Sequence, residues 1–391
     1  MAKIFFKIFL ITFFLILGFI GYFSFVGFET KSFNNQIKDN IKKIDTKLDV
    51  KLNDVKIVLD LFNLNINAKT FGPSISYNNK IVDIELIKSD ISLLNLFNKE
   101  FTLSNLFIST KSVKLKDIIA FYRAINKKNK AELFLLENFI SKGYLIADVT
   151  LNFDDQGNVK DDFKINGLVR DGSLNLLNNR KIDHINFIFA TQNRDLDIND
   201  IKFSYEKIDF TSKKIEFRKK NNFLNIEGQI NNDEVDLSEE LLKSIFDPFL
   251  KIILKTLKFS SKNKFLFKIS DKFKISDYEI KSLLNINELS AKNDINLVNI
   301  LPNYKSEITL KDHQTQIVFK KNSLLINGDG NFLIQKNYDK VSYKIIKNSN
   351  HHSFDVKFEL IDNPIIFDFL NYKTDDNSKS FVEIIGKFIK D

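Results

Sequence analysis

The sequence predicts a mainly β protein with a few helices, in which an N-terminal transmembrane helix precedes a long antiparallel meander curled into an elongated groove. Three observations predict this class. The chain opens with one long apolar run, much of the remainder alternates apolar and polar residues, and only 12 Gly and 4 Pro interrupt its 391 residues. Alternation with a period of two is typical of strands that have one apolar and one polar face.

Residues 1–28 are expected to form a membrane anchor. Lys3 and Lys7 precede the uncharged stretch from Ile8 to Val26, and a helix of that length, roughly 28 Å, can cross the hydrocarbon core of a bilayer. No alanine follows Ala2 until Ala68, so an A-x-A-like cleavage site is missing and we favour an uncleaved anchor over a retained secretion signal. The positive end should stay in the cytoplasm. This predicts a single-pass protein of the bacterial inner membrane whose bulk lies across it.

Composition excludes several classes of function. The chain has no Cys, so it can form neither disulfides nor thiolate-bound metal sites. Its net charge of +8 comes from 58 Lys and Arg set against 50 Asp and Glu. The densest basic clusters, near Lys127–Lys130 and Lys213–Lys220, are interrupted by apolar or Asn positions. A nucleic-acid partner is therefore not expected, because it would need a basic stripe with stacking aromatics.

The period of the apolar residues predicts the order of elements. Residues 29–49 read as a linking amphipathic helix, because Phe33, Ile37, Ile41, Ile44 and Leu48 recur on one helical face. Residues 50–235 follow as a first β-groove segment, with a short helix at Ser89–Leu96 and a helical insert at about 117–141, broken near Lys127–Lys130. Residues 236–257 are predicted as a helix, with Asp236 and Glu239 as a capping box. Residues 258–391 form a second β-groove segment that closes in a C-terminal helix over Phe381–Ile389.

Turn-forming residues predict hairpins between the strands. Asp154–Asn158, Asp171-Gly172, Asn327-Gly328 and Asp329-Gly330 lie among alternating segments. Such pairs commonly join antiparallel strands.

A meander of about 20–25 strands cannot remain flat, so its apolar faces must meet one another in a sandwich or line an open trough. Periodicity alone leaves both architectures open. In the trough, the candidate lining is the set of alternating apolar side chains from four regions of the chain. These are Leu145, Val149, Leu151, Phe153, Ile185, Phe187, Phe189, Phe265, Phe267, Ile269, Phe354, Val356 and Phe358.

The sequence contains no recognisable catalytic or metal-binding motif. Of the histidines, His184 lies next to a strand and His351-His352 in a polar loop, and all four, His313 included, are expected to be solvent-exposed or on a strand surface. The segment Asn327–Asn331 superficially resembles a calcium-binding loop, but the ligand spacing and terminal Glu of an EF-hand are missing. We predict a hairpin turn there instead. We expect no enzyme activity, no catalytic residue, no cofactor and no metal.

Two stretches resemble a known family. From Val55 to Leu115 the order is strand, strand, a short helix ending Leu93-Leu94-Asn95-Leu96, then Phe101–Leu106 and a strand at Val113–Leu115. With the anchor and its helix, this resembles the start of AsmA-like proteins of Gram-negative envelopes. The stretch Gly143–Ile230, with Gly167-Leu168-Val169-Arg170-Asp171-Gly172, is similar to their repeated strand module. The resemblance implies a periplasmic β-groove, anchored in the inner membrane through residues 8–26, that carries phospholipid between membranes.

Two hypotheses follow for function. The first is a non-enzymatic envelope protein that binds phospholipid in an apolar groove, with an envelope protein as a further partner. Moving a sixteen-carbon chain into water costs about 12 kcal/mol, at about 0.8 kcal/mol per CH₂, and an apolar groove removes most of that barrier. The alternative is a structural or assembly factor for outer-membrane biogenesis that acts through protein contacts. An open apolar face favours the first, and a closed, dry sheet interior favours the second.

Overall fold

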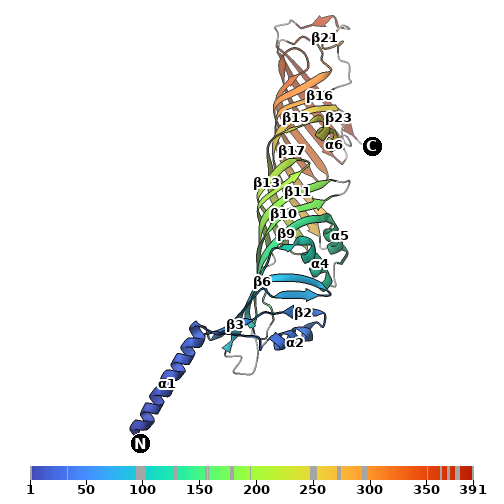
Figure 1. Cartoon of the computed structure of the whole chain (residues 1–391). Coiled ribbons are helices and arrows are strands. Elements are labelled where there is room, and N and C mark those ends of the chain that lie inside the picture. Colours follow the sequence, from blue (N-terminus) through green and yellow to red (C-terminus); the bar gives the residue numbers. More distant parts are fainter. Residues whose placement is uncertain are drawn as a thin grey trace. The chain divides into compact units, whose positions relative to one another are not determined.

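The structure is a computed structural model (Figure 1), and it confirms the predicted fold class. The chain is mainly β, with one long antiparallel sheet that curls without closing and an N-terminal apolar helix. The structure describes residues 2–32, 34–93, 103–126, 130–154, 156, 158–176, 180–193, 195–246, 253–270, 274–292, 298–349, 351–361, 363–367, 370–374 and 379–389.

Contacts within the chain define two compact units, residues 1–198 and residues 199–391. The boundary lies within β12 (Asp195–Tyr205). The sequence prediction placed the division at residues 236–257 instead. That stretch does not separate two sheets, because the strands on either side of it pair directly, up to Leu237 opposite Leu257.

Unit 1 contains the N-terminal apolar helix and an antiparallel sheet. Its hydrogen-bonded neighbours follow the order β1, β3, β4, β6, β7, β9, β10 and β11. In addition, β5 pairs with β6, β2 pairs with β5, and β8 pairs with β9. Its helices are α1 (Ala2–Phe25), α2 (Asn34–Ile44), α4 (Leu115–Ile125) and α5 (Lys130–Phe139). Its strands before the boundary are β1 (Phe28–Thr30), β2 (Leu48–Lys51), β3 (Val55–Asp60), β4 (Asn65–Phe71), β5 (Ser74–Tyr77), β6 (Lys80–Ser92), β7 (Leu103–Thr110), β8 (Val113–Lys114), β9 (Ile140–Asn152), β10 (Lys164–Asn175) and β11 (Lys181–Gln192).

Helix α1 is long and apolar enough over Phe5–Phe25 to cross a membrane. Its side chains there are not buried against the rest of the protein, unlike those of a core helix. The linking helix is confirmed in its centre as α2, while strands β1 and β2 occupy the ends of the predicted range and Phe33 lies outside the described residues. The helical insert is confirmed as the pair α4 and α5, which contacts β9 (Figure 1).

Unit 2 is a simpler meander, in which each strand pairs with the next from β13 to β20 and β23 pairs with β20. Its strands are β13 (Ile208–Lys220), β14 (Phe223–Leu237), β15 (Ile253–Ser270), β16 (Ile275–Lys292), β17 (Glu307–Lys320), β18 (Ser323–Leu333), β19 (Tyr338–Asn348), β20 (His351–Ile361) and β23 (Lys379–Ile389), with a separate pair of β21 (Ile366–Phe367) and β22 (Tyr372–Lys373). The one helix among its described residues is α6 (Glu239–Phe246).

Most of the buried apolar residues of unit 2 form two local clusters. In one, Leu242 of α6 is 1% exposed and packs with Ile208, Leu237 and Leu257. The other contains Phe332, Ile334, Val341, Leu360 and Ile365. Each cluster is confined to one part of the sheet, so the remaining apolar side chains are not part of a common core.

Three predicted helices are strands in whole or in part. Ser89–Ser92 belong to β6, and Leu94–Leu96 lie outside the described residues. Among the described residues of 236–257, only Glu239–Phe246 are helical. Asp236 lies in β14 and does not cap a helix. Residues 247–252, which include Pro248, lie outside the described residues. The predicted C-terminal helix is strand β23.

Two physical causes explain these errors. In β15 a bulge between Leu254 and Thr256 lets Leu254 and Leu257, three residues apart, join the same buried cluster, so a strand imitates helical spacing. In β23 both faces carry apolar residues, such as Phe381 on one and Ile384 on the other, which removes the alternation that marks a strand.

The Asn-Gly and Asp-Gly pairs at residues 327–330 were wrongly predicted as hairpin turns. They lie inside β18, while the turn that precedes this strand is at Lys321 and Asn322. Asp171-Gly172 likewise lies within β10, at a bulge. The turn at Asp154–Asn158 is consistent with its prediction, since the carboxylate of Asp154 accepts the backbone N–H groups of Gln156 and Asn158.

Candidate functional site: an apolar face on each unit

The predicted lining residues of unit 1 share one face of the sheet. Residues directly opposite each other in an antiparallel pair project to the same side. Leu145 lies opposite Val169, which lies opposite Phe187, and Phe189 and Ile185 lie opposite Gly167 and Gly172. Val149 and Leu151 face Ile108 and Leu106 of β7. Phe153 lies just beyond β9, bridged to Val159.

This face of unit 1 extends back to the apolar helix α1 along a row that is apolar except for Ser89. A continuous row of opposed residues runs from β1 to β9: Phe28, Ile57, Ala68, Ser89, Leu106 and Leu151. The ring of Phe28 in turn contacts that of Phe23 in α1, with centroids 5.3 Å apart. Sequence reasoning missed Phe28, because a strand of three residues shows no periodicity.

The predicted residues of unit 2 also share one face. One row across the strands contains Gly228, Phe265, Ile280, Phe319 and Leu324. Phe267 lies opposite Ile226, Ile269 opposite Leu224, and Phe354 opposite Ile345. Val356 and Phe358 lie on the same face but pack against the buried cluster around Val341.

All thirteen predicted lining residues are half-buried. In a filled sandwich, the facing side chains of two sheets would bury one another almost completely. Here Phe319, in the row with Phe265, is 41% exposed. The ring contacts join neighbours on one face: Phe265 with Phe267 at 5.6 Å and Tyr278 with Phe319 at 5.3 Å between centroids. Each unit therefore presents an apolar face that is partly open.

Glycines opposite aromatic residues shape these faces. In each such pair, a Cβ atom on the glycine would come within 3.0 Å of the ring across the strands, so the ring lies over the glycine backbone. Glycine inside a strand often marks such a close approach. This is why Asn327-Gly328 is not a turn. The pairs are Gly167–Phe189, Gly228–Phe265, Gly328–Tyr343 and Gly386–Phe354.

A band of hydrogen-bonded polar residues crosses the apolar face of unit 2. Asn232 and Ser261 are buried opposite each other and hydrogen-bonded, and the amide of Asn263 donates to the Ser261 hydroxyl at 2.7 Å. Farther along, the hydroxyls of Thr315 and Tyr343 are 2.8 Å apart. Because these groups are hydrogen-bonded to one another, an apolar ligand can cover them without leaving them unpaired.

His313 lies beside this band and is 1% exposed, so the prediction that it would be exposed was wrong. Its Nε2 bonds to the carbonyl oxygen of Asn331 at 2.9 Å, and its ring lies over Gly330. Burial lowers the pKa of His313 below its usual range, against the smaller opposing effects of the Asn331 contact and of the Asp329 and Asp312 charges.

The other histidines do not converge on a site. His184 is exposed within β11, and His351 and His352 begin β20 rather than lying in a loop. Within the described residues, no group of three or more His, Asp or Glu could hold a metal ion.

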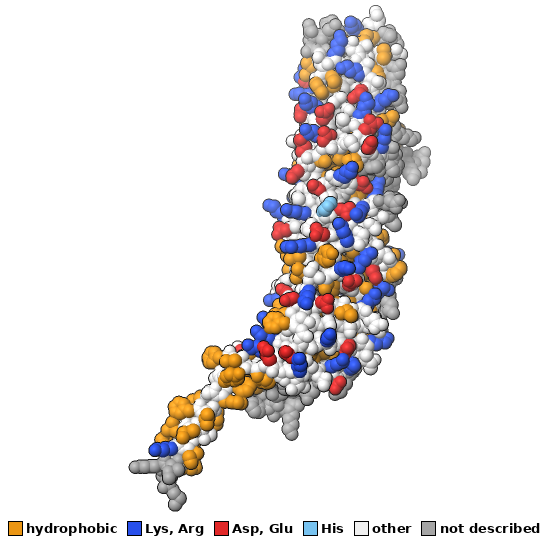
Figure 2. Space-filling view, in the orientation of Figure 1, with side chains coloured by type: hydrophobic (Ala, Val, Ile, Leu, Met, Phe, Trp, Pro, Cys, Tyr) orange, Lys and Arg blue, Asp and Glu red, His pale blue; other side chains and the backbone are white. Residues whose placement is uncertain are grey.

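The opposite face of the sheet is charged. Glu279 pairs with Lys281 at 3.3 Å and with Lys320 at 3.0 Å, and these hydrogen bonds lower the pKa of Glu279. Figure 2 shows interspersed basic and acidic side chains over the visible part of the sheet, and hydrophobic ones over α1.

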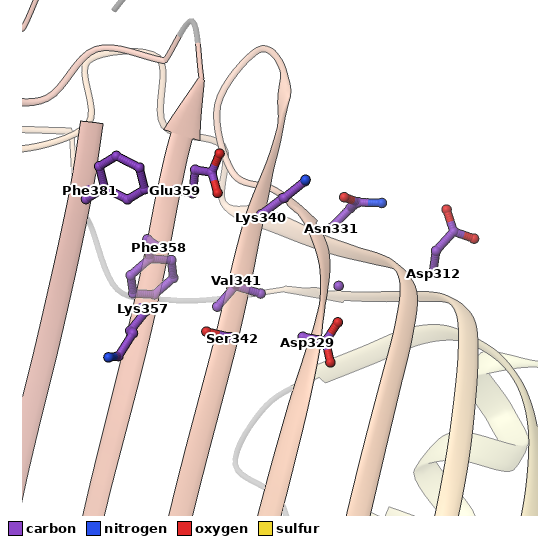
Figure 3. A pocket seen from close by; sticks show the side chains of 11 residues that line it. Asp312, Asp329, Asn331, Lys340, Val341, Ser342, Lys357, Phe358, Glu359 and Phe381 are labelled. Carbon is purple, nitrogen blue, oxygen red and sulfur yellow. The ribbon is translucent and has the colours of Figure 1, made fainter. Parts of the chain in front are cut away.

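An open hollow of about 520 Å³ lies on the charged face of unit 2 (Figure 3). In its lining, Lys357 pairs with Glu383 and Glu359 pairs with Lys379. The lining also contains the acidic residues Asp312 and Asp329. The charges are mixed and partly paired with each other, so the hollow does not point to one class of ligand.

No protein-family model, no curated protein and no solved structure matches this chain. The resemblance to AsmA-like proteins therefore stays a prediction from the sequence patterns.

Replacing Gly328 with Ala should destabilise unit 2 by about 1–3 kcal/mol, because the new Cβ would lie 2.4 Å from the Tyr343 hydroxyl oxygen. Urea unfolding of the detergent-solubilised chain, followed by circular dichroism, measures the change. In a Tyr343→Leu background the same substitution should cost less. Asp329→Ala, on the opposite face, is the control. Equal costs in both backgrounds would contradict the packing of Tyr343 over Gly328.

Stability should fall as the pH drops below about 6.5, because the unfolded chain then protonates His313 more readily than the folded chain does. The loss is at most about 1.4 kcal/mol per pH unit, between the unfolded pKa and the lowered folded pKa. His313→Gln should remove this component, as measured by urea unfolding at several pH values. An unchanged pH dependence in the variant would show that His313 titrates normally in the fold.

Proposed function

We propose that this chain is an AsmA-like envelope protein, held in the inner membrane by α1, that binds phospholipid acyl chains on its apolar faces and moves them between membranes. The observation that carries the proposal is the half-burial of every predicted lining residue on a single face of each unit. A soluble protein seldom leaves such a continuous apolar surface without a ligand or partner.

The geometry fits acyl chains better than a compact ligand. A sixteen-carbon chain in water costs about 12 kcal/mol, and a row such as Gly228, Phe265, Ile280, Phe319 and Leu324 offers apolar contact across successive strands. The lipid head group would stay in water, so the protein needs no head-group site. No catalytic step is involved.

In unit 1, the row from Phe28 to Leu151 supports entry from the bilayer that α1 crosses. Phe28 contacts α1 and lies opposite Ile57, so the first apolar position of the sheet adjoins the end of the anchor. A chain leaving the bilayer would meet apolar side chains at once. The periplasmic location of the sheet rests instead on Lys3 and Lys7, because the positive end of an anchor tends to stay in the cytoplasm.

The alternative, an assembly factor that acts through protein contacts, is favoured by one feature of β23. Phe381 and Ile385 are 73% and 70% exposed on the charged face, where neither adjoins the apolar lining. A photo-crosslinker at Phe381 would report a protein neighbour there. Protein adducts at Phe381 together with no lipid adducts on the apolar faces would favour this alternative.

A photo-crosslinking amino acid at Phe187 or Phe267 should capture phospholipid in cells, because both side chains lie on the apolar faces. The matched controls are Ile188 and Leu266, adjacent residues on the opposite face that are 50% and 39% exposed. Lipid adducts are measured by mass spectrometry of the purified chain. Equal yields at the four positions would refute the groove.

Phe267→Lys should slow transfer of a fluorescent phospholipid between liposomes by about tenfold or more, since covering an unpaired charge costs more than the 1.4 kcal/mol that gives a factor of ten. Leu266→Lys, on the charged face, should leave the rate unchanged. Circular dichroism checks that both variants fold. If the two variants transfer lipid equally fast, chains do not pass over Phe267.

A further inference from the structure

The tip of the hairpin between β3 and β4 is unusually apolar. It consists of Leu61, Phe62, Asn63 and Leu64. The side chain of Phe62 is 99% exposed, and Leu61 and Leu64 are 42% and 46% exposed. Turns that face water favour Gly, Asn, Asp, Ser and Pro instead. Three large apolar residues in one tip therefore indicate that the tip lies in an apolar environment.

The tip is held in place by hydrogen bonds. One carboxylate oxygen of Asp60 accepts the backbone N–H groups of Phe62 and Asn63, each at 3.1 Å, and the other accepts the side-chain amide of Asn63 at 2.9 Å. The carbonyl oxygen of Leu64 accepts the N–H of Leu93 at 2.9 Å. Leu64 has a φ of +51°, a left-handed conformation that leucine rarely adopts. The exposure of Phe62 therefore belongs to a defined turn.

The strand register directs this tip toward the membrane helix. β1 leads away from α1, and β3 is antiparallel to it, with Ile57 opposite Phe28. β3 thus runs back toward α1, and Val58–Asp60 carry it roughly 10 Å past the level of Phe28 before the turn. Figure 1 shows β3 beside the end of α1.

The contact at Gly27 fixes this approach. A Cβ atom on Gly27 would lie 2.2 Å from the carbonyl oxygen of Ile57 and 2.8 Å from a methyl carbon of Val58. The last residue before β1 therefore packs directly on β3. All of these residues belong to unit 1, together with α1.

We propose that the tip Leu61–Leu64 inserts into the surface of the bilayer that α1 crosses. Phe62 would enter the boundary between head groups and acyl chains, with Leu61 and Leu64 beside it. The unit would then be attached to the membrane at two points, α1 and the tip, and the first strands of the apolar face would be held against the lipid. This proposal rests on α1 as a membrane anchor and does not require lipid transfer.

The absence of Trp from the chain provides a clean test. Phe62→Trp in the full chain, reconstituted into phosphatidylcholine liposomes, creates a single fluorophore at the tip. Its emission should shift to shorter wavelength, and phospholipids brominated on the acyl chain near the head group should quench it. Replacing a fully exposed side chain should not disturb folding, which circular dichroism checks.

The matched control is Phe71→Trp, at the other end of β4, where the phenylalanine is 56% exposed. Its emission should stay typical of water and should not be quenched by brominated lipid. Equal quenching at both positions would overturn the proposal, as would a blue shift at position 62 without lipid quenching, which would indicate a protein contact. Failure of the chain to float with liposomes would overturn both the anchor and the inserted tip. Lipid transfer could fail in the earlier assays without affecting this result.

Discussion

The structure depends on strand register, because a slip of one residue would turn every apolar side chain of a strand to the charged face. Opposed residues keep the same side from strand to strand, as Gly228, Phe265, Ile280 and Phe319 show. Where a strand has an extra residue, a β-bulge keeps the apolar side chains on the same face. At Asp312, which has a φ of +54°, the register shift lets Leu310 and His313, three residues apart, lie on one face.

An apolar face of this kind must also allow an apolar ligand to pack against it. Some rings lie directly over glycine backbone, as Tyr343 does over Gly328, with no side chain between the ring and the sheet. Polar groups on this face bond to one another, as Thr315 does to Tyr343 and Ser261 to Asn232, so these groups need little from water. Charged pairs lie on the other face, where Glu279 bonds to two lysines. These features together make the face better suited to an apolar ligand than to a polar one.

The sequence predicted the class of fold because alternation is a local signal. What it could not predict depends on partners distant in the chain. Gly328 and Gly330 resemble turn residues until Tyr343 and His313 are placed over them. Leu254 and Leu257 have helical spacing until the bulge between them is known. The burial of His313 likewise depends on Gly330 and Asn331 of the next strand, so its isolated position suggested an exposed residue.

The junction of α1 with the sheet joins the apolar helix to the apolar face of unit 1. Exposing an acyl chain to water costs about 0.8 kcal/mol for each CH₂. Even a short polar gap between a bilayer and an apolar protein surface would therefore raise the free-energy barrier to moving such a chain. Phe23, Phe28 and Ile57 leave no such gap: the first two rings touch, and the third side chain lies opposite the second. Gly27 allows this contact, since any larger residue would collide with the Ile57 carbonyl and force β3 away from the helix. A single glycine therefore determines how directly the apolar face of unit 1 meets α1.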